Sequence, residues 1–309
     1  MSPPSRRTLL SAVGAGLAAT AGCLDTLGTT DDGTPRTDRS PRDSPTPDGT
    51  PDAGPSLALG ETYETDDGRT IRVDDAAVHP SVVSVDYVSS THYYERVAAA
   101  GAGQQYVVVS VTTEGFDLGA DGRKQYDDPI DVPLSVAVGG DRHDGPIPVG
   151  RDDSADRDRV AIAVPVVDAD DAAVVWARED GPRPRWRLPD AAVERLAAAP
   201  AFEVESWSVP ESVEYGTAFD ASVTVANHGG RDGRFLATLG VKQGSLGVPE
   251  AAWQVAAGET RTVTRTIEPH YYEGSETVRV VVDSGGFRED ATVEVTGGPT
   301  ETGTARPTG

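Results

Sequence analysis

The stretch "AFDASVTVANHGGRDGRFLATLGVKQG", residues 218–244, contains the clearest strand pattern in this chain of 309 residues. Apolar and polar residues alternate on both sides of a glycine-rich segment, as they do in two β-strands joined by a tight turn. In that turn we expect Asn227 to hydrogen-bond to backbone groups and Gly229 to take a positive φ. The stretch therefore predicts two strands around a glycine-rich turn, and with them a β-sheet protein.

The strand pattern continues on both sides of this pair, through residues 201–296. Further strands are predicted in "FEVESWSVP" (202–210), "WQVAAGETRTVTRTI" (253–267) and "ETVRVVVDSGGFREDATVEV" (276–295). The segments "VTVANHG", "VAAGETRTVTRTI" and "VRVVVDSGG" resemble the cell-adhesion-related domain of prokaryotic surface proteins. The resemblance implies an immunoglobulin-like β-sandwich of about seven strands. It implies little about function, because this fold hosts many roles.

Residues 57–189 show a second series of strand patterns, in which β-branched runs are separated by Gly, Pro and Asp turns. The runs are "RTIRVDDAAV" (69–78), "SVVSVDYV" (81–88), "QYVVVSVTT" (105–113), "PLSVAVGG" (133–140), "RVAIAVPVV" (159–167), "AAVVWAR" (172–178) and "RWRL" (185–188). Short strands with this punctuation predict a β-sandwich. The run from residue 69 to residue 115 resembles immunoglobulin-like domains of unknown function in bacterial and archaeal surface lipoproteins. The chain is therefore expected to be all-β, with two immunoglobulin-like β-sandwich domains.

One helix is predicted between the two domains, in "PDAAVERLAAAP" (189–200). Asp190 is expected to cap it after Pro189, and Pro200 to stop it. The predicted helix, residues 190–200, joins the two sandwiches.

The first 22 residues have the order of an export signal. Arg6 and Arg7 precede a small and apolar stretch, Thr8–Gly22, that is too short to span a membrane. The stretch Ser5-Arg6-Arg7-Thr8-Leu9-Leu10 resembles the twin-arginine translocation motif, which implies export of a folded protein. Residues 1–22 are therefore expected to be a twin-arginine signal peptide.

Cys23 is the only cysteine, so the chain can form neither an intramolecular disulfide nor a cysteine-based zinc site. Ala21-Gly22-Cys23 resembles the lipobox of prokaryotic lipoproteins, although Thr20 stands where that family usually has Leu. The resemblance implies cleavage before Cys23 and a lipid on its sulfur. The alternative interpretation, a buried and inert cysteine, does not suit a position between a signal and a polar segment.

Two segments have too few apolar residues to form a core. Residues 23–56 are built from Thr, Ser, Pro, Asp and Gly, and they are expected to form a disordered linker that starts at the lipid-attachment cysteine. Such a segment resembles the spacers that lift lipoprotein domains off a membrane, and its Thr and Ser residues are candidates for O-glycans. Residues 297–309 are expected to form a disordered tail.

The charge is strongly acidic, with 50 acidic and 27 basic residues and a net charge of −23. An acidic, lysine-poor chain resembles proteins of haloarchaea and other extreme halophiles; the alternative is an acidic protein from a GC-rich mesophile. The sequence contains no basic run that would meet nucleic-acid phosphates, so no nucleic-acid partner is expected.

The motif "HYYE" occurs twice, at residues 92–95 and 270–273. Because alternate residues of a strand face opposite sides, His92 shares a face with Tyr94, and His270 with Tyr272. These four side chains are candidates for aromatic contact with a ligand. The favoured interpretation is that both motifs are aromatic ends of loops or strands.

No other pattern points to catalysis or to a metal. The acidic runs at residues 151–159 and 168–171 do not fit a calcium loop, because the first lacks its Gly and Glu at the required positions. We therefore expect no enzyme activity, no cofactor and no metal site.

These features predict an exported protein, anchored by a lipid on Cys23 to the outer face of the cell membrane, with a non-catalytic binding or structural role. A surface protein or a glycan is the expected partner. One alternative is an accessory or solute-binding lipoprotein subunit of a transporter or redox complex. Another is an enzyme whose site is assembled from loops.

The charge yields a testable prediction. Repulsion between carboxylates destabilises the compact state in dilute salt, and the Debye length shortens from about 10 Å at 0.1 M salt to about 3 Å at 1 M. The melting temperature, followed by circular dichroism, should therefore rise with KCl concentration between these limits. Sucrose is the control for general solvent effects, and equal melting temperatures at both salt concentrations would refute the halophilic interpretation.

Overall fold

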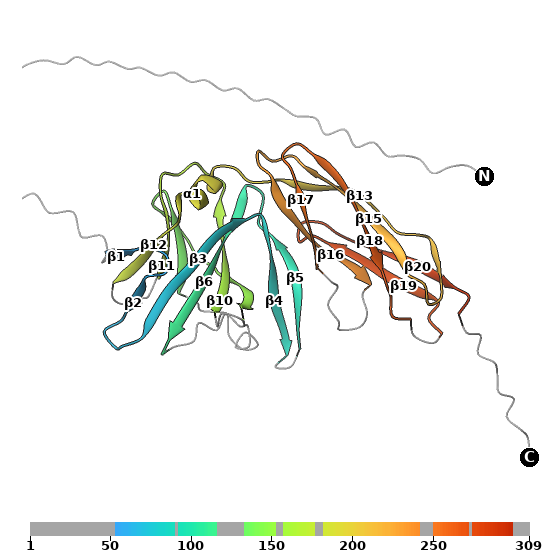
Figure 1. Cartoon of the computed structure of the whole chain (residues 1–309), viewed down its shortest axis with the longest axis horizontal. Helices are drawn as coiled ribbons and strands as arrows, with labels where there is room; N and C mark the ends of the chain where they lie inside the picture. Colours follow the sequence, from blue (N-terminus) through green and yellow to red (C-terminus); the bar gives the residue numbers. More distant parts are fainter. Residues whose placement is uncertain are drawn as a thin grey trace, which may run out of the picture. The chain divides into compact units, whose positions relative to one another are not determined.

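The computed structural model describes residues 53–89, 92–115, 133–152, 157–176, 182–241, 250–271 and 274–298. By spatial proximity the chain divides into Met1–Asp48 and Gly49–Gly309, and all described residues lie in the second unit. They form twenty strands and one helix (Figure 1). The prediction of an all-β fold is confirmed.

The first sandwich consists of two five-stranded sheets. The first sheet has the strand order β1 (Ala53–Leu57), β12 (Arg183–Arg187), β11 (Ala172–Trp176), β7 (Leu134–Val138) and β8 (Asp141–His143). The second sheet has the order β2 (Thr62–Glu64), β3 (Thr70–His79), β6 (Gln104–Glu114), β10 (Arg157–Pro165) and β9 (Ile147–Asp152).

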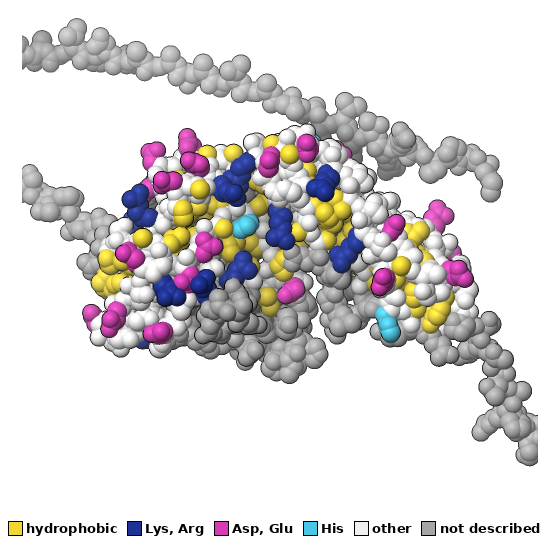
Figure 2. Space-filling model, viewed as in Figure 1, with side chains coloured by type: hydrophobic (Ala, Val, Ile, Leu, Met, Phe, Trp, Pro, Cys, Tyr) yellow, Lys and Arg dark blue, Asp and Glu magenta, His cyan; other side chains and the backbone are white. Residues whose placement is uncertain are grey.

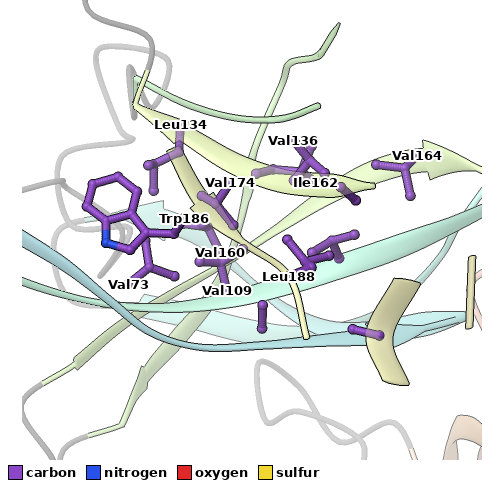
Figure 3. Close-up of a cluster of buried hydrophobic side chains, with 14 of the residues drawn as sticks. Val73, Val109, Leu134, Val136, Val160, Ile162, Val164, Val174, Trp186 and Leu188 are labelled. Carbon is purple, nitrogen blue, oxygen red and sulfur yellow. The ribbon is translucent and has the colours of Figure 1, made fainter. Parts of the chain in front are cut away.

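Branched aliphatic side chains from both sheets, together with Trp176 and Trp186, fill the core of the first sandwich, and Figure 3 shows part of this cluster around Trp186. Val109, Val136, Ile162 and Trp186 are fully buried there. The Trp186 Nε1–H donates to the Glu61 carbonyl oxygen at 2.8 Å, so its one polar atom is paired. Apolar contact therefore holds the two sheets together, and Trp186 can be buried because its indole nitrogen keeps a hydrogen bond.

A bulge in β3 keeps the apolar side of that strand facing the core. The pairing with β6 shifts between Val73 and Asp75, so Asp74 is the extra residue. Ile71 and Val73 before the shift, and Ala76 and Val78 after it, all face the same core. Without the bulge, one half of β3 would turn its apolar side chains to the other face.

A hairpin of β4 (Ser81–Ser89) and β5 (His92–Ala99) covers part of the outer face of the second sheet. Val82 of β4 packs against Tyr106 and Val108 of β6 and Ala161 of β10. Burial on both faces explains why β6 contains a continuous apolar run rather than an alternating one.

The second sandwich has eight strands, one more than the resemblance implies. The short β14, which is three residues long, accounts for the difference. One sheet contains β13 (Phe202–Ser208), β15 (Phe219–Asn227) and β18 (Thr260–Ile267). The other has the order β14 (Ser212–Glu214), β20 (Arg288–Thr296), β19 (Thr277–Asp283), β16 (Gly233–Val241) and β17 (Glu250–Val255). Val223, Leu239, Val282 and Val293 are fully buried between the sheets. The arrangement is immunoglobulin-like.

In both sandwiches a short early strand pairs in parallel with a late one, β1 with β12 and β14 with β20. This pairing corrects the predicted linker, which was expected to extend to residue 56. Residues from Ala53 onward instead form β1, and Ser56 pairs with Arg185. Gly54 and Pro55 made this edge strand resemble a linker.

The helix α1 (Asp190–Leu196) is shorter than predicted and belongs to the first core. Pro189 occupies the N-cap without a side-chain hydrogen bond, so the predicted cap by Asp190 is wrong. Gln105 is fully buried, and its Nε2 donates to the carbonyl oxygens of Arg195 at 3.2 Å and Leu196 at 3.0 Å. These bonds satisfy terminal carbonyls, and the helix ends well before Pro200.

Asn227, the only asparagine of the chain, ties together one end of the second sandwich. Its side chain is 1% exposed. Its Oδ1 accepts from the amide nitrogens of Ala201 and Gly229, both at 3.0 Å. Its Nδ2 donates to the carbonyl oxygens of Arg231 at 2.8 Å and Val255 at 3.1 Å. The predicted hydrogen bonding of Asn227 to the backbone is confirmed.

The predicted positive φ at Gly229 is wrong, because Gly229 is not among the glycines with positive φ. The glycine is needed for space instead. A Cβ atom at this position would lie 2.3 Å from the Ala199 carbonyl oxygen and 2.4 Å from the Ala201 nitrogen.

Asn227→Ala should lower the free energy of unfolding by about 2–4 kcal/mol, because it leaves two amide hydrogens and two carbonyl oxygens without their partner. Chemical denaturation in high salt measures the change. His228→Ala is the matched control, since His228 is the neighbouring residue and is exposed. Equal stability of the two variants would show that the amide network does not stabilise the fold.

Candidate functional site

A groove of about 620 Å³ lies where the β4–β5 hairpin meets the second sandwich. This volume is within the range of small-molecule sites. Six parts of the chain line the groove: Pro80 and Ser81, the β5–β6 turn within 99–104, Val166, residues 199–204, Phe235 and Leu236 of β16, and the β19–β20 turn within 284–287. The groove therefore exists only when these separate elements are assembled.

The β19–β20 turn closes one side of the groove by packing against the end of β5. Gly285 has a φ of 80°. A Cβ atom on it would lie 2.5 Å from the Ala99 nitrogen and 2.8 Å from the Val97 carbonyl oxygen. Within the turn, the Gly285 N–H donates to Asp283 Oδ1 at 2.9 Å. Only glycine combines this backbone conformation with so close an approach.

Residues 199–201 form another wall and are fixed from both sides. The Ala201 N–H donates to Asn227 Oδ1 at 3.0 Å, and its carbonyl oxygen accepts from the His228 N–H at 2.8 Å. Arg231 Nη1 donates to the Arg195 carbonyl oxygen at 3.2 Å, next to the C-terminal end of α1. The network around Asn227 therefore also shapes the groove.

The groove lining consists mainly of small residues, aromatic rings and backbone. Ser81, Gln104, Glu203 and Ser284 supply its polar side chains. Glu203 is the one carboxylate among the described lining residues, and its Oε2 lies 3.2 Å from His228 Nε2. Both side chains of this pair are well exposed. This lining suits binding through shape and backbone hydrogen bonds, because its described residues bring no nucleophile next to a base.

The candidate residues from the sequence lie elsewhere. His92 is the first residue of β5 and pairs with Ser89, and Tyr94 pairs with Asp86. His270 follows β18. Tyr272 lies outside the described residues, as do Arg6, Arg7 and Cys23. None of the candidates is among the described residues that line the groove.

Tyr271, between the two candidates of the second motif, has a structural role. Its Oη–H donates to the Thr217 carbonyl oxygen at 2.7 Å, and its ring lies 5.2 Å from that of Tyr215. Burial raises its pKa. The ring packs against the second core, so this phenol serves the fold.

Two further features are absent from the described residues. They contain no group of three or more His, Cys, Asp or Glu residues placed to hold a metal ion. Within the same ranges, no helix combines the length and apolarity that crossing a membrane would require.

No family model and no curated protein matches this sequence. Among solved structures, a β-glucosidase from Listeria innocua in complex with glucose is 24% identical over 32% of this chain, with a TM-score of 0.26. The matched region spans 16% of that enzyme's chain. An uncharacterized β-sandwich protein from Clostridium difficile is 13% identical over 47% of this chain and 100% of its own, with a TM-score of 0.29. A chimeric titin Z1Z2 protein is 12% identical over 72% of this chain and 97% of its own, with a TM-score of 0.17.

At these scores the likenesses support no functional argument. The fold itself defines the class, an all-β protein built from immunoglobulin-like β-sandwiches.

Gly285→Ala should lower the free energy of unfolding by about 2–4 kcal/mol, because it adds a backbone clash to the strain of a positive φ. Gly216→Ala is the matched control: φ there is 79° and a Cβ atom would meet nothing within 4 Å. The control should lose about 1 kcal/mol. Amide hydrogen exchange at Ala99 should increase in the first variant only, and equal behaviour of both variants would refute the contact.

Proposed function

We propose that this chain is an exported surface protein, held by a lipid on Cys23 at the outer face of the cell membrane, with a non-catalytic binding role. The observation that carries the proposal is the position of the only cysteine, directly after Arg6, Arg7 and the small apolar stretch that follows them. That order suits export followed by attachment.

The composition of the described residues supports a binding role. The groove offers shape, backbone and a few polar side chains, and its one carboxylate lies beside His228. An acyl- or glycosyl-transfer site would need a nucleophile with a base, or two carboxylates facing one another.

The segment between Cys23 and β1 supports a role at some distance from the membrane. Because β1 begins at Ala53, residues 24–52 separate the cysteine from the fold. A flexible segment of this length spans about 30 Å, and proline and charge extend it. The groove would then be presented to molecules beyond the membrane surface.

The test is fractionation of the full-length chain from expressing cells. Cys23→Ser should release the exported chain from the membrane fraction, because the thiol that carries the lipid is lost. Replacing Arg6 and Arg7 with Lys should retain the chain in the cytoplasm. Ser44→Ala, in the segment between Cys23 and β1, is the control and should change neither result.

Mass spectrometry of the mature N-terminus measures the modification directly. A lipid on Cys23 supports the proposal, and membrane retention of the Cys23→Ser chain contradicts it. If that retained chain co-purifies with one membrane protein in equal amounts, the accessory-subunit alternative replaces the proposal.

A further inference from the structure

Arginines gather on the outer face of the second sheet of the first sandwich. The strand pairing places Arg72 of β3 next to Thr112 of β6, and Ser110 of β6 between Arg159 of β10 and Asp75 of β3. Arg157 begins β10, two residues before Arg159. Figure 2 shows basic side chains across the middle of this face, over β3, β6 and β10, with a few acidic side chains among them and others toward its ends. The chain as a whole carries 50 acidic and 27 basic residues, so this face differs from the average.

At one end of the face, one carboxylate lies beside two guanidinium groups. Asp74 is 8% exposed and lies 2.6 Å from Arg72 Nε and 3.7 Å from Arg157 Nε. Thr112 Oγ1 also donates to Asp74, at 2.6 Å. Arg157 Nε is buried without a hydrogen-bond partner. The group of Asp74 and the two arginines therefore keeps a positive charge.

At the other end of the face lies His79, the last residue of β3. Burial lowers its pKa, and Arg159, Arg195 and Arg234 lower it further, while Asp75 opposes them. Arginines from three elements, β10, α1 and β16, thus lower the pKa of this one imidazole. Such clustering weakens the fold by like-charge repulsion, and the hydrogen bonds of sheet and helix do not require it.

We propose that this basic patch, formed by Arg72, Arg157, Arg159 and Arg195 around the uncharged imidazole of His79, binds an acidic glycan, a polymer whose carboxylate or sulfate groups are separated by sugar hydroxyls. Guanidinium groups pair with such anions through two parallel hydrogen bonds. The backbones of Arg72 and Arg157 are two strand spacings apart, about 10 Å, and their guanidinium groups both lie beside Asp74. Ser110 lies between Arg159 of β10 and Asp75 of β3, so a hydroxyl stands beside the guanidinium group on this face. The four arginines outnumber the two carboxylates, Asp74 and Asp75, so the patch keeps a net positive charge.

Charge density favours a glycan over a nucleic acid. Duplex DNA carries about one charge per 1.7 Å, and the net charge of −23 would repel it strongly. A glycan with fewer charges needs only local pairing with the patch. Local pairing persists in salt that screens the repulsion between whole molecules.

The inference deepens the proposed function by naming a partner class, and it is tested without a membrane. The full chain, purified in salt that keeps it folded, is titrated onto immobilised polygalacturonate, which carries carboxylates, and onto dextran sulfate. Neutral dextran, duplex DNA and anionic phospholipid vesicles are the comparisons. We expect binding to at least one acidic glycan, none to dextran, and weaker binding to DNA and vesicles than to that glycan.

The variants locate the site. Arg159→Gln with Arg195→Gln should weaken glycan binding by about tenfold, whereas Lys at both positions should keep most of it, because the charge remains. The control is Arg279→Gln with Arg288→Gln, whose arginines pair with Asp290 at 2.7 Å and Asp283 at 3.0 Å. Melting temperatures establish that each variant is folded.

Several outcomes overturn the proposal. These are an absence of binding to both acidic glycans, equal binding to neutral dextran, tighter binding to DNA or vesicles, or an equal loss in the control variant. If the Gln variant unfolds, full binding by the Lys variant together with competition by free polygalacturonate still supports the site. Loss of membrane attachment in the Cys23→Ser chain leaves these results unchanged, so the two proposals fail separately.

Discussion

The side-chain amide of Asn227 is the constraint on which the second sandwich and the groove both depend. Its four hydrogen bonds reach residues 201, 229, 231 and 255, which belong to three segments of the chain: the segment that leads into β13, the β15–β16 turn and the end of β17. A buried amide satisfied on all sides fixes geometry as well as energy, because any shift of one segment leaves a polar group unpaired. Residues 199–201 are thereby set against β15 and β16, and they form a wall of the groove.

The β4–β5 hairpin supplies the other half of the arrangement. On one side Val82 packs on Tyr106 and Val108 of the second sheet. At its end, Ala99 lies against the turn that contains Gly285. One hairpin thus covers an apolar face and borders the groove, so the same contacts stabilise the fold and shape the candidate site.

Much of the fold could be predicted from the sequence, because most core strands carry their own pattern. The strands β3, β6, β10, β15 and β16 overlap the predicted runs. Edge strands could not be predicted in this way, since β1 contains Gly54 and Pro55 and is held by pairing with β12. The groove and the basic patch could not be predicted either. They depend on which strands become neighbours, which a single sequence does not encode locally.

In so acidic a chain, arginines that lack a carboxylate partner of their own need an explanation. Where carboxylates outnumber cations so strongly, an arginine is most easily stabilised beside an acid, as Arg279 is beside Asp290. Arg157 instead shares Asp74 with Arg72, and its Nε, 3.7 Å from that carboxylate, has no hydrogen bond. Repulsion between Arg159 and Arg195, which both lower the pKa of His79, opposes folding. A bound polyanion would remove that repulsion and add hydrogen bonds, so ligand binding and stability should be coupled at this face.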